Sequence, residues 1–186
     1  MRVFIGIKLS KITILSVKKE LKPFKKIGTP IKWTKDENLH LTLKFLGEIE
    51  ENILNRLLED FDKSFKEIKT FDLQLKEFGN FSNKGNLTIF WIGVEKNKEL
   101  IKLFNKIEEI CEKNGFKREE RELIPHITLG RNKKNYNFKK IYELIGNYNN
   151  KKIAEQNVNS FQIFKSVLTP QGPVYSILKE IKIDTA

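Results

Sequence analysis

The chain has 186 residues, enough for one compact domain with a sizeable core and too few for two ordinary ones. Hydrophobic residues make up 39% of it and charged residues 32%, which excludes a disordered chain, and its single cysteine, Cys111, excludes a disulfide framework or a multi-cysteine metal site. The net charge of +11 favours polyanionic partners such as nucleic acids, although a lysine-rich composition also arises without such a partner.

The opening run of the chain, Val3–Leu9, is β-like. Lys8, Ser10 and Lys11 break its apolar character, so it does not resemble a signal peptide. No apolar stretch in the sequence approaches the ~18 residues that a membrane span needs. We therefore expect a cytoplasmic protein with no membrane partner.

The first half of the chain, roughly residues 1–86, predicts the element order β-α-β-α-β. After the opening strand, an amphipathic helix has Ser10 as its N-cap, and Pro23 ends or interrupts it. The remaining elements are a strand over Leu39–Gly47, a helix marked by apolar residues between Ile53 and Phe65, and a strand or hairpin over Phe71–Phe81.

The second half, roughly residues 87–186, repeats this order. The expected elements are a strand over Leu87–Val94, a helix whose apolar face includes Cys111 and which stops at Asn114-Gly115, a strand over Pro125–Arg131, a helix over Phe138–Ile145 and a strand over Phe161–Leu168. A turn at Pro170–Pro173 leads to a final strand over Val174–Ile183.

This loose internal repeat predicts an α+β fold within a single domain, residues 1–186. Each half would form a lobe made of a curved sheet with helices on its outer face. A pseudo-two-fold axis would relate the two lobes.

The two histidines of the protein, His40 and His126, lie at matching places in the repeat and in the same pattern, His-x-Thr-Leu. Side chains alternate between the faces of a strand, so His40 and Thr42 share one face, as do His126 and Thr128. If the lobes face each other, the four polar groups converge in one cleft. A single strand histidine is more often structural than catalytic, but the repetition of the whole pattern favours catalysis.

A pair of histidines suits proton transfer near neutral pH, because the unperturbed pKa of histidine is about 6.5. One imidazole can take a proton from water while the other gives a proton to a departing oxygen. Threonine hydroxyl groups can donate to phosphoryl oxygens beside the reacting phosphorus. This combination indicates in-line opening of a phosphodiester without a metal. Two histidines are too few for a protein-only structural zinc site unless carboxylates complete it.

These residues and their flanks resemble the 2H phosphoesterase superfamily, and within it the RNA 2′,3′-cyclic phosphodiesterase branch, also called the 2′-5′ RNA ligase (LigT-like) family. The similarity extends over essentially the whole chain. Its segments are Arg2–Ile7, Trp33, Glu37–Gly47, Phe90–Val94, Pro125–Arg131, Lys165–Leu168 and Gly172–Tyr175. One departure is Gly130, where the family often has alanine.

The resemblance implies a bilobal fold of antiparallel sheets around a central groove, with no metal and no other cofactor. It implies hydrolysis of 2′,3′-cyclic phosphates, on RNA ends or small cyclic nucleotides, to 2′-phosphates. His40 would be the proton donor to the leaving 3′ oxygen and His126 the proton acceptor from water. Thr42 and Thr128 would bind the phosphate oxygens. No obligate protein partner is evident from the sequence.

Five further residues are candidates for the groove. Arg131 could bind phosphate or stack on a base. Phe4 could line the groove and stack on a base, or belong to the core. Phe45 could do the same only if a bulge intervenes, because regular alternation puts it on the buried face. Lys44 is expected on the face of His40 and Thr42, where it would add positive potential. The role of Tyr175 could be structural.

Two alternatives to hydrolysis are open at this point. The same two histidines could run a ligase or a reversible transesterase that makes 2′-5′ linkages. A basic groove could also belong to a non-catalytic RNA-binding module, although the intact pair of motifs argues against it.

Overall fold

The computed structural model describes residues 1–83, 86–120 and 122–183. Their strands are β1 (Arg2–Lys8), β2 (Lys32–Trp33), β3 (His40–Glu48), β4 (Phe71–Asn83), β5 (Asn86–Val94), β6 (His126–Arg131), β7 (Lys152–Val158), β8 (Ser160–Thr169) and β9 (Gly172–Lys182). Their helices are α1 (Lys11–Lys26), the short 3₁₀ helix η1 (Asp36–Asn38), α2 (Glu51–Asp62), α3 (Lys98–Lys113) and α4 (Lys139–Gly146). The expected α+β class is confirmed.

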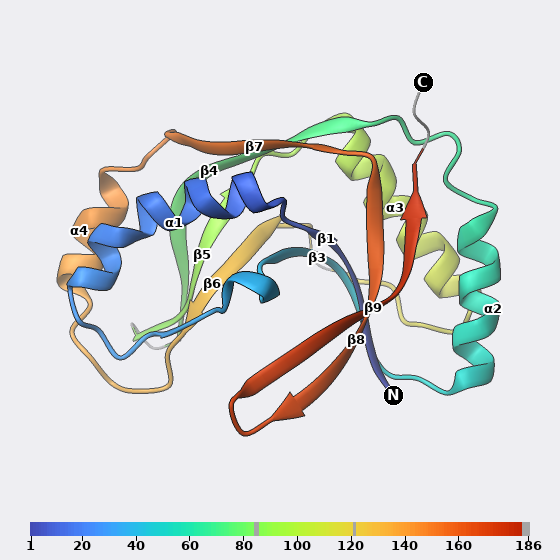
Figure 1. Ribbon diagram of the computed structural model, residues 1–186, viewed down its shortest axis with the longest axis horizontal. Helices are drawn as coiled ribbons and strands as arrows, with labels where there is room; N and C mark the ends of the chain where they lie inside the picture. Colours follow the sequence, from blue (N-terminus) through green and yellow to red (C-terminus); the bar gives the residue numbers. More distant parts are fainter. Residues whose placement is uncertain (84–85, 121, 184–186) are drawn as a thin grey trace.

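The strands form one antiparallel sheet in the order β7-β4-β5-β6-β3-β1-β8-β9, and the short β2 pairs with β6. The two histidine strands, β3 and β6, lie next to each other at the middle of this order. They share a single registered pair, Leu41 with Ile127. β3 and β6 are therefore the least extensively paired neighbours along this order, and the two His-x-Thr motifs meet there (Figure 1).

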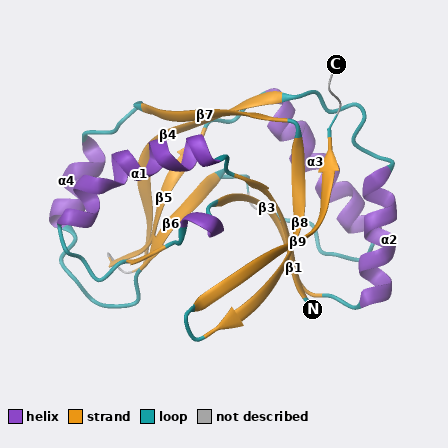
Figure 2. Ribbon diagram, viewed as in Figure 1, coloured by secondary structure: helices purple, strands orange, loops and turns teal. Residues whose placement is uncertain are grey.

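The two sides of the sheet do not follow the two sequence halves. β4, from the first half, pairs with β5 and β7, whereas β8, from the second half, pairs with β1. Helices α1 and α4 lie on the side of β4, β5 and β7, and α2 and α3 lie on the side of β8 and β9 (Figures 1 and 2). β4 of the first half thus lies among strands of the second half, and β8 of the second half pairs with a strand of the first.

Helix α1 begins as expected but ends later. The hydroxyl oxygen of Ser10 accepts a hydrogen bond from the backbone N–H of Thr13, which confirms the N-cap. The prediction that Pro23 ends or interrupts the helix is wrong, because α1 continues to Lys26. Phe24, the residue after Pro23, is fully buried against Phe78, Phe90 and Tyr148. Burial of this ring offsets the hydrogen bond that proline cannot make, a cost of about 3 kcal/mol.

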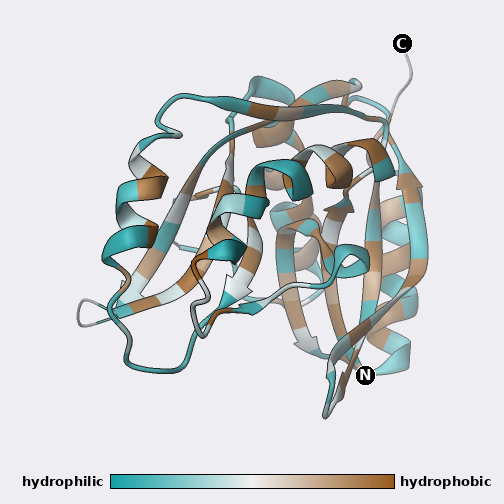
Figure 3. Ribbon diagram, turned by 60° about the vertical axis from the view of Figure 1, so that its left-hand side comes forward, coloured by the Kyte–Doolittle hydropathy of each residue, from teal (hydrophilic) through white to brown (hydrophobic). Residues whose placement is uncertain are grey.

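Hydrophobic residues alternate with hydrophilic ones along the strands and helices, as Figure 3 shows. One continuous core results, and it extends from Ile5 of β1 to Ile92 of β5. Cys111 lies in this core, and burial raises the pKa of its thiol to about 12. Among the helices of the described residues, none has both the length and the apolar character needed to cross a bilayer.

Candidate active site

The junction of β3 and β6 brings the two motifs together. In an antiparallel pair, the register of Leu41 with Ile127 puts His40 opposite Thr128, and Thr42 opposite His126. Leu41 and Ile127 are fully buried, so the four polar residues share the other face. Each imidazole thus lies across from the hydroxyl of the other motif, and the two histidines are diagonal neighbours.

The imidazole of His40 is held at both nitrogens. Its Nδ1 lies 2.6 Å from the carbonyl oxygen of Asn38, at the end of η1, and its Nε2 lies 3.0 Å from Thr42 Oγ1. A carbonyl oxygen can only accept, so Nδ1 carries the proton. In the neutral ring, Nε2 then accepts from the Thr42 hydroxyl group.

His126 repeats the first of these contacts. Its Nδ1 lies 2.7 Å from the carbonyl oxygen of Ile124, which is again the residue two positions before the histidine. The carbonyl fixes the proton on Nδ1 and leaves Nε2 as the basic nitrogen. Both motifs therefore orient their histidines by the same backbone device.

The surroundings of the two imidazoles differ. His40 packs against Phe4, with ring centroids 4.8 Å apart, and against Tyr175, whose ring meets it edge-on at 5.4 Å. Burial, opposed by the hydrogen bond to Asn38 and assisted by the positive charge of Arg131, lowers the pKa of His40. Burial likewise raises the pKa of Tyr175.

His126 lies among other aromatic rings. Phe81 of β4 meets it edge-on at 5.0 Å, and Trp91 of β5 lies 6.2 Å away. The indole of Trp91 occupies the space above Gly79, where a Cβ atom would come within 2.1 Å of the ring. Gly79 is thus the residue that lets this aromatic group approach His126.

Phe4 supports the site from below. It stacks on Phe164 with ring centroids 4.8 Å apart, and only 2% of its surface is exposed. No face of its ring is available to a base in this structure. The alternative that Phe4 belongs to the core is the one that fits, and its contact with the site is the packing against His40.

Strand β3 is bulged, and the bulges decide where Lys44 and Phe45 point. The register with β1 passes from Thr42 directly to Lys44 and from Phe45 directly to Gly47. The alternation of side chains shifts at each skipped residue. The expectation that Lys44 shares the face of Thr42 is therefore wrong, since Lys44 is buried. Phe45 is 64% exposed and lies on the groove side.

A cavity of about 470 Å³ lies beside His40. It is lined by His40, Thr42, Phe45, Thr128 and Arg131, by Tyr175 and Trp33, and by the cationic side chains of Lys32, Lys35, Lys133 and Lys134. No carboxylate is found among its lining residues within the described part of the chain. This cavity therefore suits an anion with a planar group attached.

A second cavity, of about 730 Å³, adjoins the first. It contains His126, and Thr42 and Phe45 line both cavities. Its other walls come from α3 and from the connection between α3 and β6, including Glu108, Lys117 and Ile124. Thr42 thus lies between the two cavities, with His40 on one side and His126 on the other.

Sequence reasoning missed several groove residues. Lys32 belongs to β2 and Lys35 is the N-cap of η1, two short elements that the sequence pattern does not reveal. Lys133 and Lys134 follow Arg131 closely, and this basic run was a signal that could have found them. The glycine at position 130, in place of alanine, has a steric reason. A Cβ atom on residue 130 would lie 2.4 Å from the side chain of Ile31.

Comparisons with known proteins identify a family for the chain. Residues 28–167 match the model of the 2′-5′ RNA ligase superfamily. An RNA 2′,3′-cyclic phosphodiesterase of Methanocaldococcus jannaschii is 38% identical over 180 residues, which cover 97% of this chain and 99% of that protein. One of Thermotoga maritima is 34% identical over 184 residues, covering 99% and 96%.

Solved structures share the fold. TT0787 of Thermus thermophilus superposes with a TM-score of 0.78 at 23% identity, covering 100% of this chain and 99% of that one. The LigT protein of E. coli, in complex with 3′-AMP, gives a TM-score of 0.76 at 21% identity, covering 98% and 97%. The expected family is confirmed, and the chain belongs to the 2′-5′ RNA ligase superfamily.

Proposed function

We propose that the protein hydrolyses 2′,3′-cyclic phosphates, at RNA ends or on small nucleotides, to 2′-phosphates. The observation that carries this proposal is the register of β3 with β6, which sets each histidine opposite the threonine of the other motif. Relatives named RNA 2′,3′-cyclic phosphodiesterase, at 38% and 34% identity over nearly the whole chain, support the same substrate class. We also propose that the protein is cytoplasmic, since RNA substrates are present in that compartment.

In the proposed reaction, His126 takes a proton from water through Nε2 as the water oxygen bonds to phosphorus. The bond between phosphorus and O3′ breaks, and His40 gives its Nε2 proton to that oxygen. The hydroxyl groups of Thr42 and Thr128 donate to the phosphate oxygens. After the reaction His126 carries one extra proton and His40 lacks one. His126 releases its proton to solvent and His40 takes one up, so the protons balance.

His40 has to acquire its proton for this role, since burial and Arg131 favour the neutral ring. The negative charge of the bound phosphate favours the imidazolium form. Once Nε2 is protonated it no longer accepts from Thr42, so the Thr42 hydroxyl group is released to donate to phosphate. The contact between His40 and Thr42 would thus couple substrate binding to protonation.

The cationic lining of the smaller cavity supports binding of the RNA chain on the His40 side. The charge of Arg131 acts on His40, and Lys32, Lys35, Lys133 and Lys134 extend the positive surface. Lys and Arg side chains neutralise backbone phosphates without reading the sequence. We therefore assign phosphate binding to Arg131 and expect Phe45, at the border of the two cavities, to stack on a base.

A turnover assay tests the proposal. The substrate is a nucleoside 2′,3′-cyclic phosphate, and the products are resolved as 2′- and 3′-phosphates. The expected product is the 2′-phosphate alone. A 3′-phosphate, or no turnover by folded protein, would overturn the proposal. Joining of an added RNA with a 5′-hydroxyl end through a 2′-5′ linkage, faster than hydrolysis, would identify a ligase instead.

A further inference from the structure

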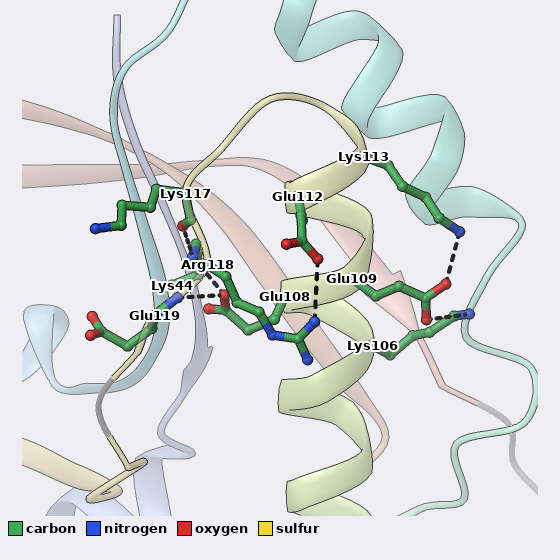
Figure 4. Close-up of polar contacts among 9 residues, drawn as sticks. All are labelled: Lys44, Lys106, Glu108, Glu109, Glu112, Lys113, Lys117, Arg118 and Glu119. Atoms are coloured by element: carbon green, nitrogen blue, oxygen red, sulfur yellow. Dashed lines mark hydrogen bonds and ion pairs between the residues drawn. The ribbon is translucent and has the colours of Figure 1, made fainter.

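A buried ion pair holds the connection between α3 and β6 (Figure 4). The Lys44 ammonium lies 2.7 Å from Glu108 Oε2, and the two side chains are 7% and 1% exposed. Lys44 Nζ also donates to the carbonyl oxygen of Lys117 at 2.7 Å. The backbone N–H of Glu119 donates to the same Glu108 oxygen at 3.0 Å. The pair thus binds one backbone acceptor and one backbone donor of the connection.

This pair lines the larger cavity together with Thr42 and His126. Lys44 follows Thr42 by two residues on β3, and the bulge between them turns it toward Glu108 of α3. The connection that it holds runs on to Ile124, whose carbonyl oxygen orients His126. The next carbonyl, that of Pro125, accepts from the backbone N–H of Val94 and joins the connection to the sheet. The orienting carbonyl therefore lies between two anchors, the ion pair and the sheet.

The ion pair is distinct from its neighbours on the same helix. Glu109 pairs with Lys106 and Lys113, and Glu112 pairs with Arg118, but these side chains are partly or largely exposed (Figure 4). Exposed pairs contribute little to stability. A buried pair is rarely more stabilising than apolar residues of similar size, and its best-supported use is to select one conformation. Of the three acidic residues Glu108, Glu109 and Glu112, Glu108 is therefore the one whose ion pair can fix the conformation of the backbone around it.

We propose that Lys44 and Glu108 are positioning residues for His126. By fixing the backbone at Lys117 and Glu119, they keep the Ile124 carbonyl in place, and this carbonyl keeps the proton of His126 on Nδ1. The basic Nε2 then faces the groove. The proposal rests on the proposed function only for its effect on rate, since the proton position on His126 is measurable in the absence of any substrate.

The main test replaces both charged residues in the variant Lys44→Met/Glu108→Leu, which leaves no unpaired buried charge. The readout is the ¹⁵N spectrum of the two imidazoles at a pH where both are neutral. In the unaltered protein, His126 and His40 are both expected as the Nδ1–H tautomer. In the double variant His126 should become a mixture of tautomers, whereas His40, oriented by Asn38, should not change. The kcat should fall roughly 10- to 100-fold, with KM for a cyclic mononucleotide little changed.

Glu109→Gln is the matched control, because it removes two exposed ion pairs one residue away on α3 and should alter neither imidazole. If His126 keeps its tautomer and kcat in the folded double variant, the proposal is wrong. If no protein turns over the substrate while the tautomer of His126 still shifts, the proposed function fails and the positioning role stands.

A second comparison covers the case in which the double variant does not fold. Glu119→Pro and Glu119→Ala both remove the side chain, but only proline removes the N–H that donates to Glu108. The proline variant should shift the tautomer of His126 and lower kcat relative to the alanine variant. Equal spectra and equal kcat for the two variants would overturn the proposal independently of the buried pair.

Discussion

Leu41 of β3 faces Ile127 of β6 in the single registered pair that joins the two sides of the sheet. Both side chains are fully buried, and each lies between the histidine and the threonine of its own motif. Their contact therefore fixes the register in which the two motifs are presented. A slip of one residue would reverse the facing of one motif and bury its histidine.

The two imidazoles are expected to be essential for turnover. His40→Ala and His126→Ala should each reduce kcat by about 100-fold or more, the usual contribution of a general acid or base. Both variants should remain folded, as judged by circular dichroism and thermal unfolding. Near-normal turnover by either folded variant would exclude the two-histidine mechanism.

The pH dependence of stability should report the environment of His40. Its pKa is lowered in the folded protein, so the unfolded chain binds this proton first as the pH falls. The free energy of unfolding should therefore decrease as the pH falls from about 6.5 through the folded pKa, by at most ~1.4 kcal/mol per pH unit for this group. Urea unfolding of the unaltered protein and of His40→Asn between pH 5 and 7 measures the difference. Identical pH slopes would contradict the lowered pKa.

The pH dependence of kcat/KM should be bell-shaped, because one imidazole must be protonated and the other neutral. The two limbs belong to the coupled pair, not to single residues. A steady-state rate profile with a nucleoside 2′,3′-cyclic phosphate checks this. A profile that is flat between pH 5 and 8 would count against proton transfer by histidine.

Phe4 and Phe45 should behave differently although they lie within 5.8 Å of each other, centroid to centroid. Phe4→Ala should reduce the free energy of unfolding by about 3–5 kcal/mol, because it leaves a cavity beneath His40. Phe45→Ala removes an exposed ring and should change stability by roughly 0.5 kcal/mol or less, while raising KM. Chemical denaturation and steady-state kinetics separate the two effects. A stability loss for Phe45→Ala equal to that of Phe4→Ala would contradict the placement of the rings.

Salt should separate distributed charge from the local site. Raising salt from about 50 to 200 mM should raise KM for an oligonucleotide ending in a 2′,3′-cyclic phosphate much more than KM for the mononucleotide. The lysines around the smaller cavity have few phosphates to neutralise on a mononucleotide. Arg131→Ala should weaken binding of both substrates. Equal salt dependence for the two would mean that the net charge of +11 makes no extended contact with RNA.

The repeated motif made the central part of the site predictable. Alternation along two short strands is a local property, so His40 with Thr42 and His126 with Thr128 follow from their spacing alone. The bulges of β3 are not local, because they arise from pairing with β1. For this reason, regular alternation predicted the wrong face for Lys44, and it placed Phe45 in the groove only on the condition that a bulge intervenes.

Edge elements were the least predictable part of the fold. β7, over Lys152–Val158, was missed because Val158 is the one residue in it that is buried, so it lacks the apolar alternation of an inner strand. The pairing of β4 with β7 and of β8 with β1 also depends on contacts distant in sequence. The order of elements predicted a repeat, but not that β4 would pair with strands of the second half and β8 with a strand of the first.

The pairing of β4 and β8 with strands of the other half has a consequence for folding. β1 can pair with β3, but it lacks its second neighbour until β8 has been synthesised, more than 100 residues later, and β5 relies on β4 from the other half. A chain cut between β4 and β5 would leave each fragment with an unpaired strand edge and an uncovered apolar surface. We expect the two fragments to become structured only when mixed, and the intact protein to unfold in one cooperative transition. A substitution that destabilises either histidine strand would then lower the free energy of unfolding of the entire chain.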